Sequence, residues 1–176
     1  MSFRYFKDPR AFAYMAEGGE ACHFCKSTTD CLDGEHFYGD NEIKAVCFSC
    51  MQAGRLIELD ISANEIDESE LDPNLVDIEL VAKEITYCTP MLPTWQEALW
   101  PIKGGKPYRF VKIASRVDYA SKQQFMESLA DQSGDVDWLW DMLPDHKIES
   151  IDEGQYDLSF YLFDSDGDKL TIWDAN

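Results

Sequence analysis

Four cysteines form two Cys-x-x-Cys pairs, Cys22 with Cys25 and Cys47 with Cys50. Two residues between the cysteines of a pair allow a tight turn that directs both sulfur atoms toward one point. Two such turns supply four thiolates at the corners of a tetrahedron, the donor set of structural zinc sites. The sequence therefore predicts a zinc ion (Zn) held by Cys22, Cys25, Cys47 and Cys50.

A closed set of four thiolates leaves no coordination position for water, so we expect this zinc to be structural. Three other interpretations of the thiols stay open: a redox dithiol in one pair, unmetallated core cysteines, and a catalytic zinc with three protein ligands. Cys31 and Cys88 are expected to be packed apolar residues, because the paired cysteines already complete a site.

The three histidines are weaker candidates for metal binding. His23 lies inside the first cysteine pair, and His36 lies in the segment between the two pairs. Either histidine is able to replace a thiol as a metal ligand, but we expect both to lie outside the ligand set. His146 has no partner that the sequence reveals, and it is expected to be exposed.

The charge of the chain restricts its partners. The chain has 34 Asp and Glu against 15 Lys and Arg, a formal net charge of −19. Nucleic-acid binding requires basic charge that displaces counterions, so no nucleic-acid partner is expected. The acidic excess favours a cationic protein partner.

One basic strip interrupts the acidic sequence, and it consists of Lys103, Lys106, Arg109, Lys112, Arg116 and Lys122. We expect this basic strip to lie against acidic residues of the same chain, with a phosphate or partner contact as the alternative.

The chain of 176 residues is slightly longer than one average domain. We expect residues 1–56 to form an N-terminal segment with the zinc-binding module and residues 57–176 to form an α+β domain. The longest apolar run near the N-terminus, residues 11–16, is too short for a signal peptide or a membrane span. We therefore expect a cytoplasmic protein, whose thiols stay reduced and available to a metal.

Capping residues predict three helices. Asp72 and Pro73 open the first, which ends near Tyr87, while Ser121 opens the second and Asp135 the third. The inward face of the first helix is predicted to contain Leu75, Ile78, Val81, Ala82 and Ile85.

Residues 108–113 are predicted to form a strand, and residues 156–163 and 169–174 a terminal hairpin. The acidic residues 57–74 are expected to form a surface loop. The predicted fold class is α+β: a small N-terminal zinc-knuckle module, similar to a zinc ribbon, packs on a domain with an antiparallel sheet and two to three helices.

The segment from Thr94 to Pro101 is the densest in aromatic residues. Trp95 and Leu99 share one face of a helix at this spacing, and we expect core packing for the segment, with a ligand or partner groove as the alternative. No phosphate loop or nucleophile motif accompanies it, and the carboxylates of Asp164–Asp168 are better explained by a hairpin turn than by calcium.

Several motifs together resemble the CbrC family, a group of largely uncharacterised bacterial proteins whose named member is linked to colicin tolerance. The resemblance covers roughly residues 3–110 and rests on Phe3–Pro9, the two cysteine pairs, Met51–Gly54, Thr89–Pro90, Trp95–Gln96 and Trp100. Members often carry a Cys-x-x-Cys-Gly turn near the C-terminal hairpin, where this chain has Asp164–Gly167. The resemblance supports the four metal ligands and supplies no catalytic residues.

These observations favour a non-catalytic zinc-binding protein of the cytoplasm that acts by protein interaction, with toxin (colicin) tolerance as the specific form that the resemblance implies. An acidic protein of this kind would occupy the phosphate-binding cleft of a basic nuclease toxin. One alternative is a small enzyme whose pocket, lined by Trp95, Gln96 and Arg109, lies near the Trp95–Trp100 segment. The other alternative is a dithiol redox sensor that uses Cys22 or Cys25.

Overall fold

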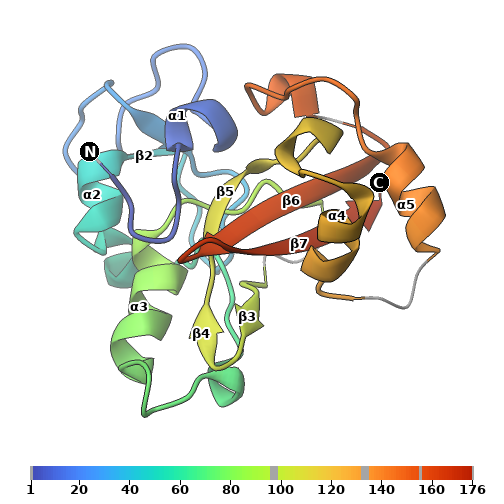
Figure 1. Ribbon diagram of the computed structural model, residues 1–176. Helices are drawn as coiled ribbons and strands as arrows, with labels where there is room; N and C mark the ends of the chain where they lie inside the picture. The colour runs from blue at the N-terminus through green and yellow to red at the C-terminus, as the bar shows by residue number, and fades with distance from the viewer. Residues whose placement is uncertain (1, 96–98, 132–134, 155, 176) are drawn as a thin grey trace.

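A three-stranded antiparallel sheet forms the centre of the molecule in the computed structural model, which describes residues 2–95, 99–131, 135–154 and 156–175 (Figure 1). Its strands are β5 (Arg109–Ile113), β6 (Leu158–Ser165) and β7 (Asp168–Ala175), in the order β5-β6-β7. Figure 1 shows the N-terminal segments on one side of this sheet and α4 and α5 on the other.

Strands β6 and β7 form the predicted terminal hairpin. Ser165 pairs with Asp168, so Asp166 and Gly167 alone make the connection. Both have positive φ angles, 53° and 88°. A two-residue turn of this kind follows the right-handed twist of the strands and favours Asp-Gly, which explains why the local sequence predicts it.

Strand β6 is buried on both faces and therefore separates two hydrophobic cores. Tyr161 and Phe163 pack into the first core, while Phe160 and Leu162 point the other way into the second. Alternate residues of a strand face opposite sides of a sheet, so an almost continuous apolar run is what a strand between two cores requires.

The first core is covered by short elements. These are α1 (Pro9–Phe12), β1 (Cys31–Asp33), β2 (Ala45–Cys47), α2 (Phe48–Gln52), the 3-10 helices η1 (Arg55–Leu59) and η2 (Glu68–Glu70), α3 (Ile78–Cys88), β3 (Ile102–Lys103) and β4 (Lys106–Pro107). Residues on both sides of position 56 contribute to this core, for example Phe48 and Trp100.

The second core is covered by two helices, α4 (Lys122–Ser128) and α5 (Val136–Met142), together with η3 (Arg116–Asp118); η4 (Asp152–Gly154) precedes β6. The predicted caps are confirmed: the Ser121 side chain accepts a hydrogen bond from Gln124 N, and the Asp135 side chain accepts from Trp138 N. Each cap satisfies N–H groups that the first turn of a helix leaves free.

The predicted start of the first helix is wrong, although its end is correct. Helix α3 begins at Ile78, and its cap is Asp77, whose carboxylate accepts from Leu80 N. The Asp72 carboxylate instead accepts from Asn74 N in a turn, and its own N–H donates to Gly105 O at the β3–β4 connection. Leu75 consequently lies outside the helix and is half exposed.

The predicted surface loop at residues 57–74 is partly buried. Ile61, Ala63, Asn64 and Leu71 have almost no exposed surface. The Asn64 amide donates to the carbonyls of Ile85, Thr89 and Pro90 and accepts from Leu92 N. This side chain therefore fixes the segment to the C-terminal end of α3, which the acidic composition of residues 57–74 does not reveal.

Core packing of the aromatic segment is confirmed for Trp100 and is wrong for Trp95 and Leu99. Trp100 is buried, and its Nε1–H donates to Tyr108 O. Trp95 is 56% exposed and Leu99 is 52% exposed. Gln96 lies outside the described residues. The fold class itself is confirmed, because small antiparallel sheets and a few helices surround an N-terminal cluster of cysteines.

Candidate metal centre

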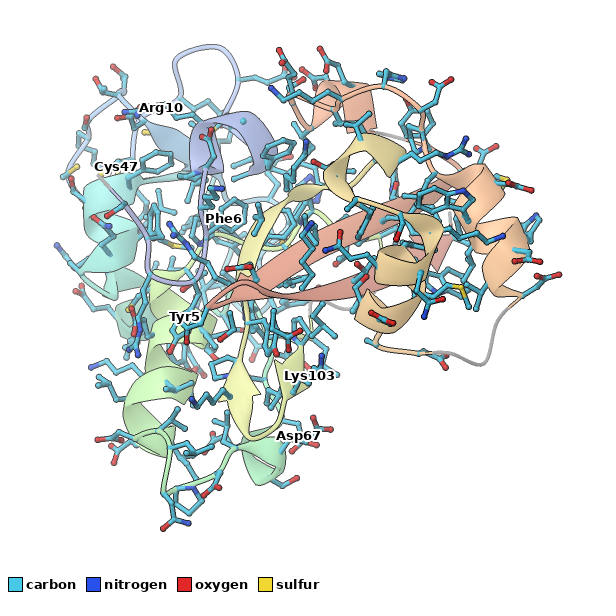
Figure 2. All side chains as sticks on the ribbon, in the orientation of Figure 1. Tyr5, Phe6, Arg10, Cys47, Asp67 and Lys103 are labelled. Carbon is cyan, nitrogen blue, oxygen red and sulfur yellow. The ribbon has the colours of Figure 1, made fainter. Side chains whose placement is uncertain are left out.

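The two cysteine pairs come together in the N-terminal part of the molecule, where Figure 2 labels Cys47. One Sγ from each of Cys22, Cys25, Cys47 and Cys50 lies within 4.8 Å of all the others, and the Sγ atoms of Cys25 and Cys47 are 3.5 Å apart. Four sulfur atoms around a zinc ion at about 2.3 Å would be about 3.8 Å from one another. The cluster therefore has the dimensions of a tetrahedral metal site.

Backbone hydrogen bonds close the first cysteine turn and attach it to β2. Lys26 N donates to Cys22 O at 3.0 Å, and Cys22 N donates to Ser27 O at 2.7 Å. His23 N donates to Ala45 O in β2. Lys26 has a φ of 63°, the left-handed conformation that ends such a turn.

The second cysteine pair spans the junction of a strand and a helix. Cys47 is the last residue of β2 and the N-cap of α2, which contains Cys50. Phe48 N donates to Asp30 O at 2.9 Å, and Cys31 pairs with Cys47 across the β1–β2 ladder. The short β1–β2 hairpin thus determines where the second pair lies relative to the first.

Three of the four thiols are shielded from water. Cys22, Cys47 and Cys50 are buried, whereas Cys25 is exposed. Burial raises the pKa of the Cys47 and Cys50 thiols above their usual value. Burial also opposes ionisation of Cys22, but hydrogen bonds from the backbone of Cys25, Cys47 and Phe24 outweigh it and lower the pKa of Cys22 to about 6. The lowered pKa favours a thiolate at Cys22 near neutral pH, whereas thiols with a raised pKa have to release protons before they are able to coordinate a metal ion.

Two cations lie beside the cluster. Lys26 follows the first pair, and its Nζ donates to His23 O at 2.7 Å. Arg55 lies over the ring of Phe24 and pairs with Glu58, whose carboxylate raises the pKa of the guanidinium, with a smaller contribution from the nearby Cys50 and Cys22. Arg55 was not predicted from the sequence; its position five residues after Cys50, at the start of η1, is the signal that was available. A tetrathiolate zinc site has a net charge of −2, and nearby cations stabilise it.

The two remaining cysteines lie outside the cluster. Cys31 is buried and donates to Ser27 O at 3.2 Å, so its prediction as a packed residue is confirmed. Cys88 is half-buried at the end of α3, near Gly54.

The histidines lie outside the cluster as well. His23 is exposed and packs against Phe24, while His36 lies beside Tyr14. His146 is exposed, as predicted, and its Nε2 is 3.3 Å from the hydroxyl of Tyr156.

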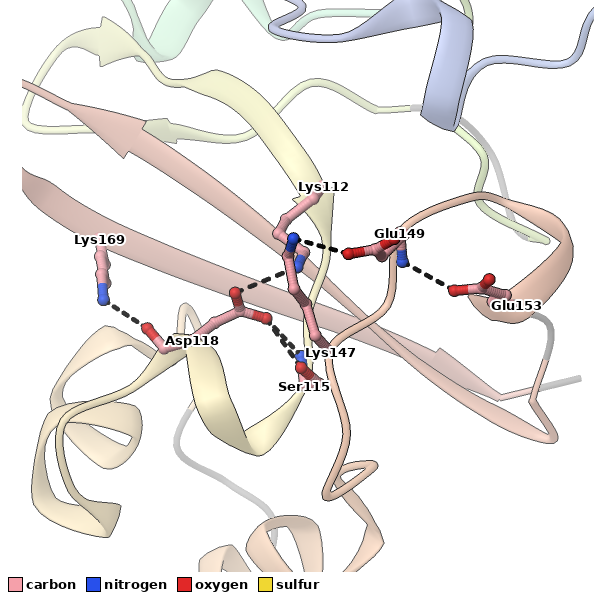
Figure 3. A network of polar contacts seen from close by, with 7 residues as sticks. All are labelled: Lys112, Ser115, Asp118, Lys147, Glu149, Glu153 and Lys169. Atoms are coloured by element: carbon pink, nitrogen blue, oxygen red, sulfur yellow. Dashed lines mark hydrogen bonds and ion pairs between the residues drawn. The ribbon is translucent and has the colours of Figure 1, made fainter.

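Most of the basic strip is paired within the chain. Lys103 pairs with Asp168 and Lys122 with Asp137, while the Arg116 guanidinium donates to carbonyls at the C-terminal end of α5. The most buried pair is that of Lys112 with Asp118 at 3.1 Å, which Figure 3 shows next to the pair of Lys147 with Glu149. Asp118 also accepts from Ser115, and its backbone carbonyl accepts from Lys169.

The pocket expected between the aromatic segment and the basic strip is not formed by Trp95 and Arg109. Arg109 lines a hollow of about 450 Å³ together with Arg4, Lys106 and Asp164, and Trp95 does not belong to its lining. The Asp164–Asp168 segment is the hairpin turn predicted from its sequence, with Gly167 N donating to Asp164 Oδ1. Within the described ranges, the cysteine cluster is the set of side chains with the spacing of a metal site.

The fold and the cluster define an α+β protein with four thiols that are able to hold a metal ion. The chain belongs to the family described as Uncharacterised protein family (UPF0167), whose model matches residues 1–167. This match extends well beyond residues 3–110, on which the resemblance to the CbrC family rests. No curated protein and no solved structure matches the chain. Among the described residues, none of the helices has both the length and the apolar composition needed to cross a bilayer.

Proposed function

We propose that the chain binds one Zn²⁺ through Cys22, Cys25, Cys47 and Cys50, and that this ion has a structural role. The observation that carries the proposal is the mutual approach of the four Sγ atoms to within 4.8 Å. Thiolate donors at this spacing favour zinc over hard cations, which require oxygen ligands. Four protein ligands leave no position for a reacting water molecule, which supports a structural role.

The segments that the metal connects have little regular structure of their own. Strands β1 and β2 contain three residues each, and α2 contains five. Elements of this size are unstable in isolation. Zinc binding by four thiolates contributes on the order of 10–16 kcal/mol of apparent free energy, which in such a module becomes folding free energy.

Elemental analysis and native mass spectrometry of the purified protein test this proposal. We expect one zinc per chain in the wild type and loss of the metal in Cys47→Ser. Cys31→Ser is the matched control, because Cys31 lies opposite Cys47 in the β1–β2 ladder, is buried and is not part of the cluster. A metal-free wild type, or equal metal loss in both variants, would contradict the assignment.

For the biological role, we propose that this zinc-stabilised protein acts in the cytoplasm by binding a cationic protein. The net charge of −19 supports this partner class, since charge complementarity accelerates association and discriminates against acidic partners. Most of the basic strip is paired internally, so it offers little attraction for phosphate groups.

Colicin tolerance, which the CbrC resemblance implies, is the specific form of this proposal. A basic toxin nuclease domain should bind with a rate that falls as salt increases, because surface charges are screened. Surface plasmon resonance at several salt concentrations measures this rate. Absence of binding at low salt excludes the toxin version.

A dithiol sensor is the second candidate. It is favoured by the exposure of Cys25 next to Cys22, whose pKa is lowered to about 6. A sensor requires free thiols in the purified protein and a Cys22–Cys25 disulfide after mild oxidation. A tightly bound zinc in the same mass spectra rules out this candidate.

A further inference from the structure

Helix α5 has apolar residues on two faces. Leu139 and Leu143 are buried in the second core, with Trp140 packed beside them. Trp138 and Met142 lie four residues apart and therefore share the outer face, where they are 49% and 43% exposed. A surface helix needs only one apolar face, so packing within this chain does not account for the exposed pair Trp138 and Met142.

Figure 1 shows α5 at the outer edge of the molecule, on the side opposite to α2. The outer face is therefore remote from the cysteine cluster. A large rigid ring beside an adaptable thioether is a combination enriched at binding surfaces, because the ring supplies area and the methionine adjusts to a partner.

Carboxylates border this exposed pair. Asp141 follows on the helix and Asp145 lies just beyond its end, and both are exposed. Two cations contact α5: Lys122 pairs with Asp137 at 2.5 Å, and Arg116 donates to carbonyls at the C-terminal end of the helix and keeps its positive charge. The exposed carboxylates of Asp137, Asp141 and Asp145 outnumber these two cations, so the surface around Trp138 and Met142 has a net negative charge.

We propose that the outer face of α5, formed by Trp138 and Met142 with the carboxylates of Asp141 and Asp145, is the docking site for a basic amphipathic helical segment of a protein partner. The proposal rests on the cationic partner proposed above and gives it a location. A helix with an apolar stripe and basic flanks is complementary to an apolar pair that is bordered by carboxylates. A second copy of this chain does not match, because each copy has a net charge of −19 and would place carboxylates against carboxylates.

The test uses a synthetic, tryptophan-free amphipathic helix with leucines on one face and lysines on the other, labelled for fluorescence anisotropy. We expect the zinc-loaded wild type to bind it with an affinity that falls as salt increases. Trp138→Ser should weaken binding by about tenfold or more, the effect of losing an aromatic hot spot. Trp95→Ser is the matched control, since Trp95 is 56% exposed on another segment, and it should leave the affinity unchanged.

Asp141→Asn with Asp145→Asn keeps the apolar pair and should weaken binding while reducing its salt dependence. Glu68→Gln with Glu70→Gln in η2 is the matched control for charge and should have a smaller effect. Circular dichroism verifies that each variant is folded.

Equal effects of Trp138→Ser and Trp95→Ser would overturn the proposal while leaving a cationic partner in place elsewhere. Equally tight binding of a peptide with serines in place of the leucines would also overturn it, because the apolar pair would then contribute nothing. Absence of any binding to the wild type would contradict both this docking site and the proposal of a cationic partner, but it would leave the zinc assignment unchanged. A dimer in sedimentation experiments that Trp138→Ser abolishes would identify a second copy as the occupant and contradict the proposal.

Discussion

The two faces of the β5–β6–β7 sheet are covered in different ways. One face is covered by α3 together with short strands, 3-10 helices and loops, and the cysteine cluster lies among the shortest of these segments. The other is covered by α4 and α5, each of which begins with a side-chain cap and contributes buried apolar residues. The short segments around the cysteine cluster gain little from local hydrogen bonding, so we expect them to depend on cross-links between distant parts of the chain, whereas α4 and α5 depend on packing.

Metal removal should separate the two faces most clearly. With a strong chelator, we expect hydrogen exchange to accelerate throughout β1, β2 and residues 22–30, while α4, β6 and β7 keep their protection. The expected loss is large because the proposed zinc ion would contribute on the order of 10–16 kcal/mol of apparent free energy. Uniform protection after chelation would show that the first face does not require the metal.

Truncation of the second core should have the next largest effect. Phe160→Ala removes a buried ring that contacts Phe125, and a cavity of this kind costs about 3–5 kcal/mol of unfolding free energy. Urea denaturation measures the loss, and mass spectrometry should find the zinc content unchanged. Release of zinc by this variant would mean that the two faces unfold as one unit.

Asn64→Ala tests the hydrogen bonds that join Asn64 to the C-terminal end of α3 on the first face and that do not involve the cysteine cluster. The substitution leaves Leu92 N and carbonyls at the end of α3 without a partner, which costs about 1–3 kcal/mol of unfolding free energy. Asn74→Ala is the control, since Asn74 is exposed and its side chain donates to Asp72 within the same turn. Similar losses of stability in both variants would contradict the role assigned to Asn64.

The smallest effect is expected at the exposed end of the basic strip. Lys103 and Asp168 form an ion pair in which both side chains are well exposed, so Lys103→Ala should change the unfolding free energy by about 0–1 kcal/mol. Lys112→Ala should cost more, because the pair with Asp118 is largely shielded from water. Thermal unfolding of both variants compares them, and the reverse order would disprove the distinction.

Features that a few neighbouring residues specify could be predicted from the sequence. The paired cysteine spacing, the Asp166–Gly167 turn and the caps at Ser121 and Asp135 each depend on backbone geometry within one turn. The predicted start of α3 was wrong because Asp72, followed by Pro73, has the sequence of a helix cap, whereas the cap of α3 is Asp77. Asp72 is held in a turn by Asn74, and its N–H bonds to Gly105, a residue remote in the chain.

Sequence spacing by itself determined which four thiols form the cluster and that the terminal strands pair, because both follow from short-range geometry. The tertiary structure decided that Asn64 is buried and Trp95 exposed, and that Arg55 lies beside the thiols. Burial depends on what the rest of the chain places over a residue, and neither hydrophobicity nor periodicity in one segment contains that information. For the same reason, the sequence of α5 does not show that Trp138 and Met142 are exposed. Their exposure follows from how the helix packs on the sheet and the second core.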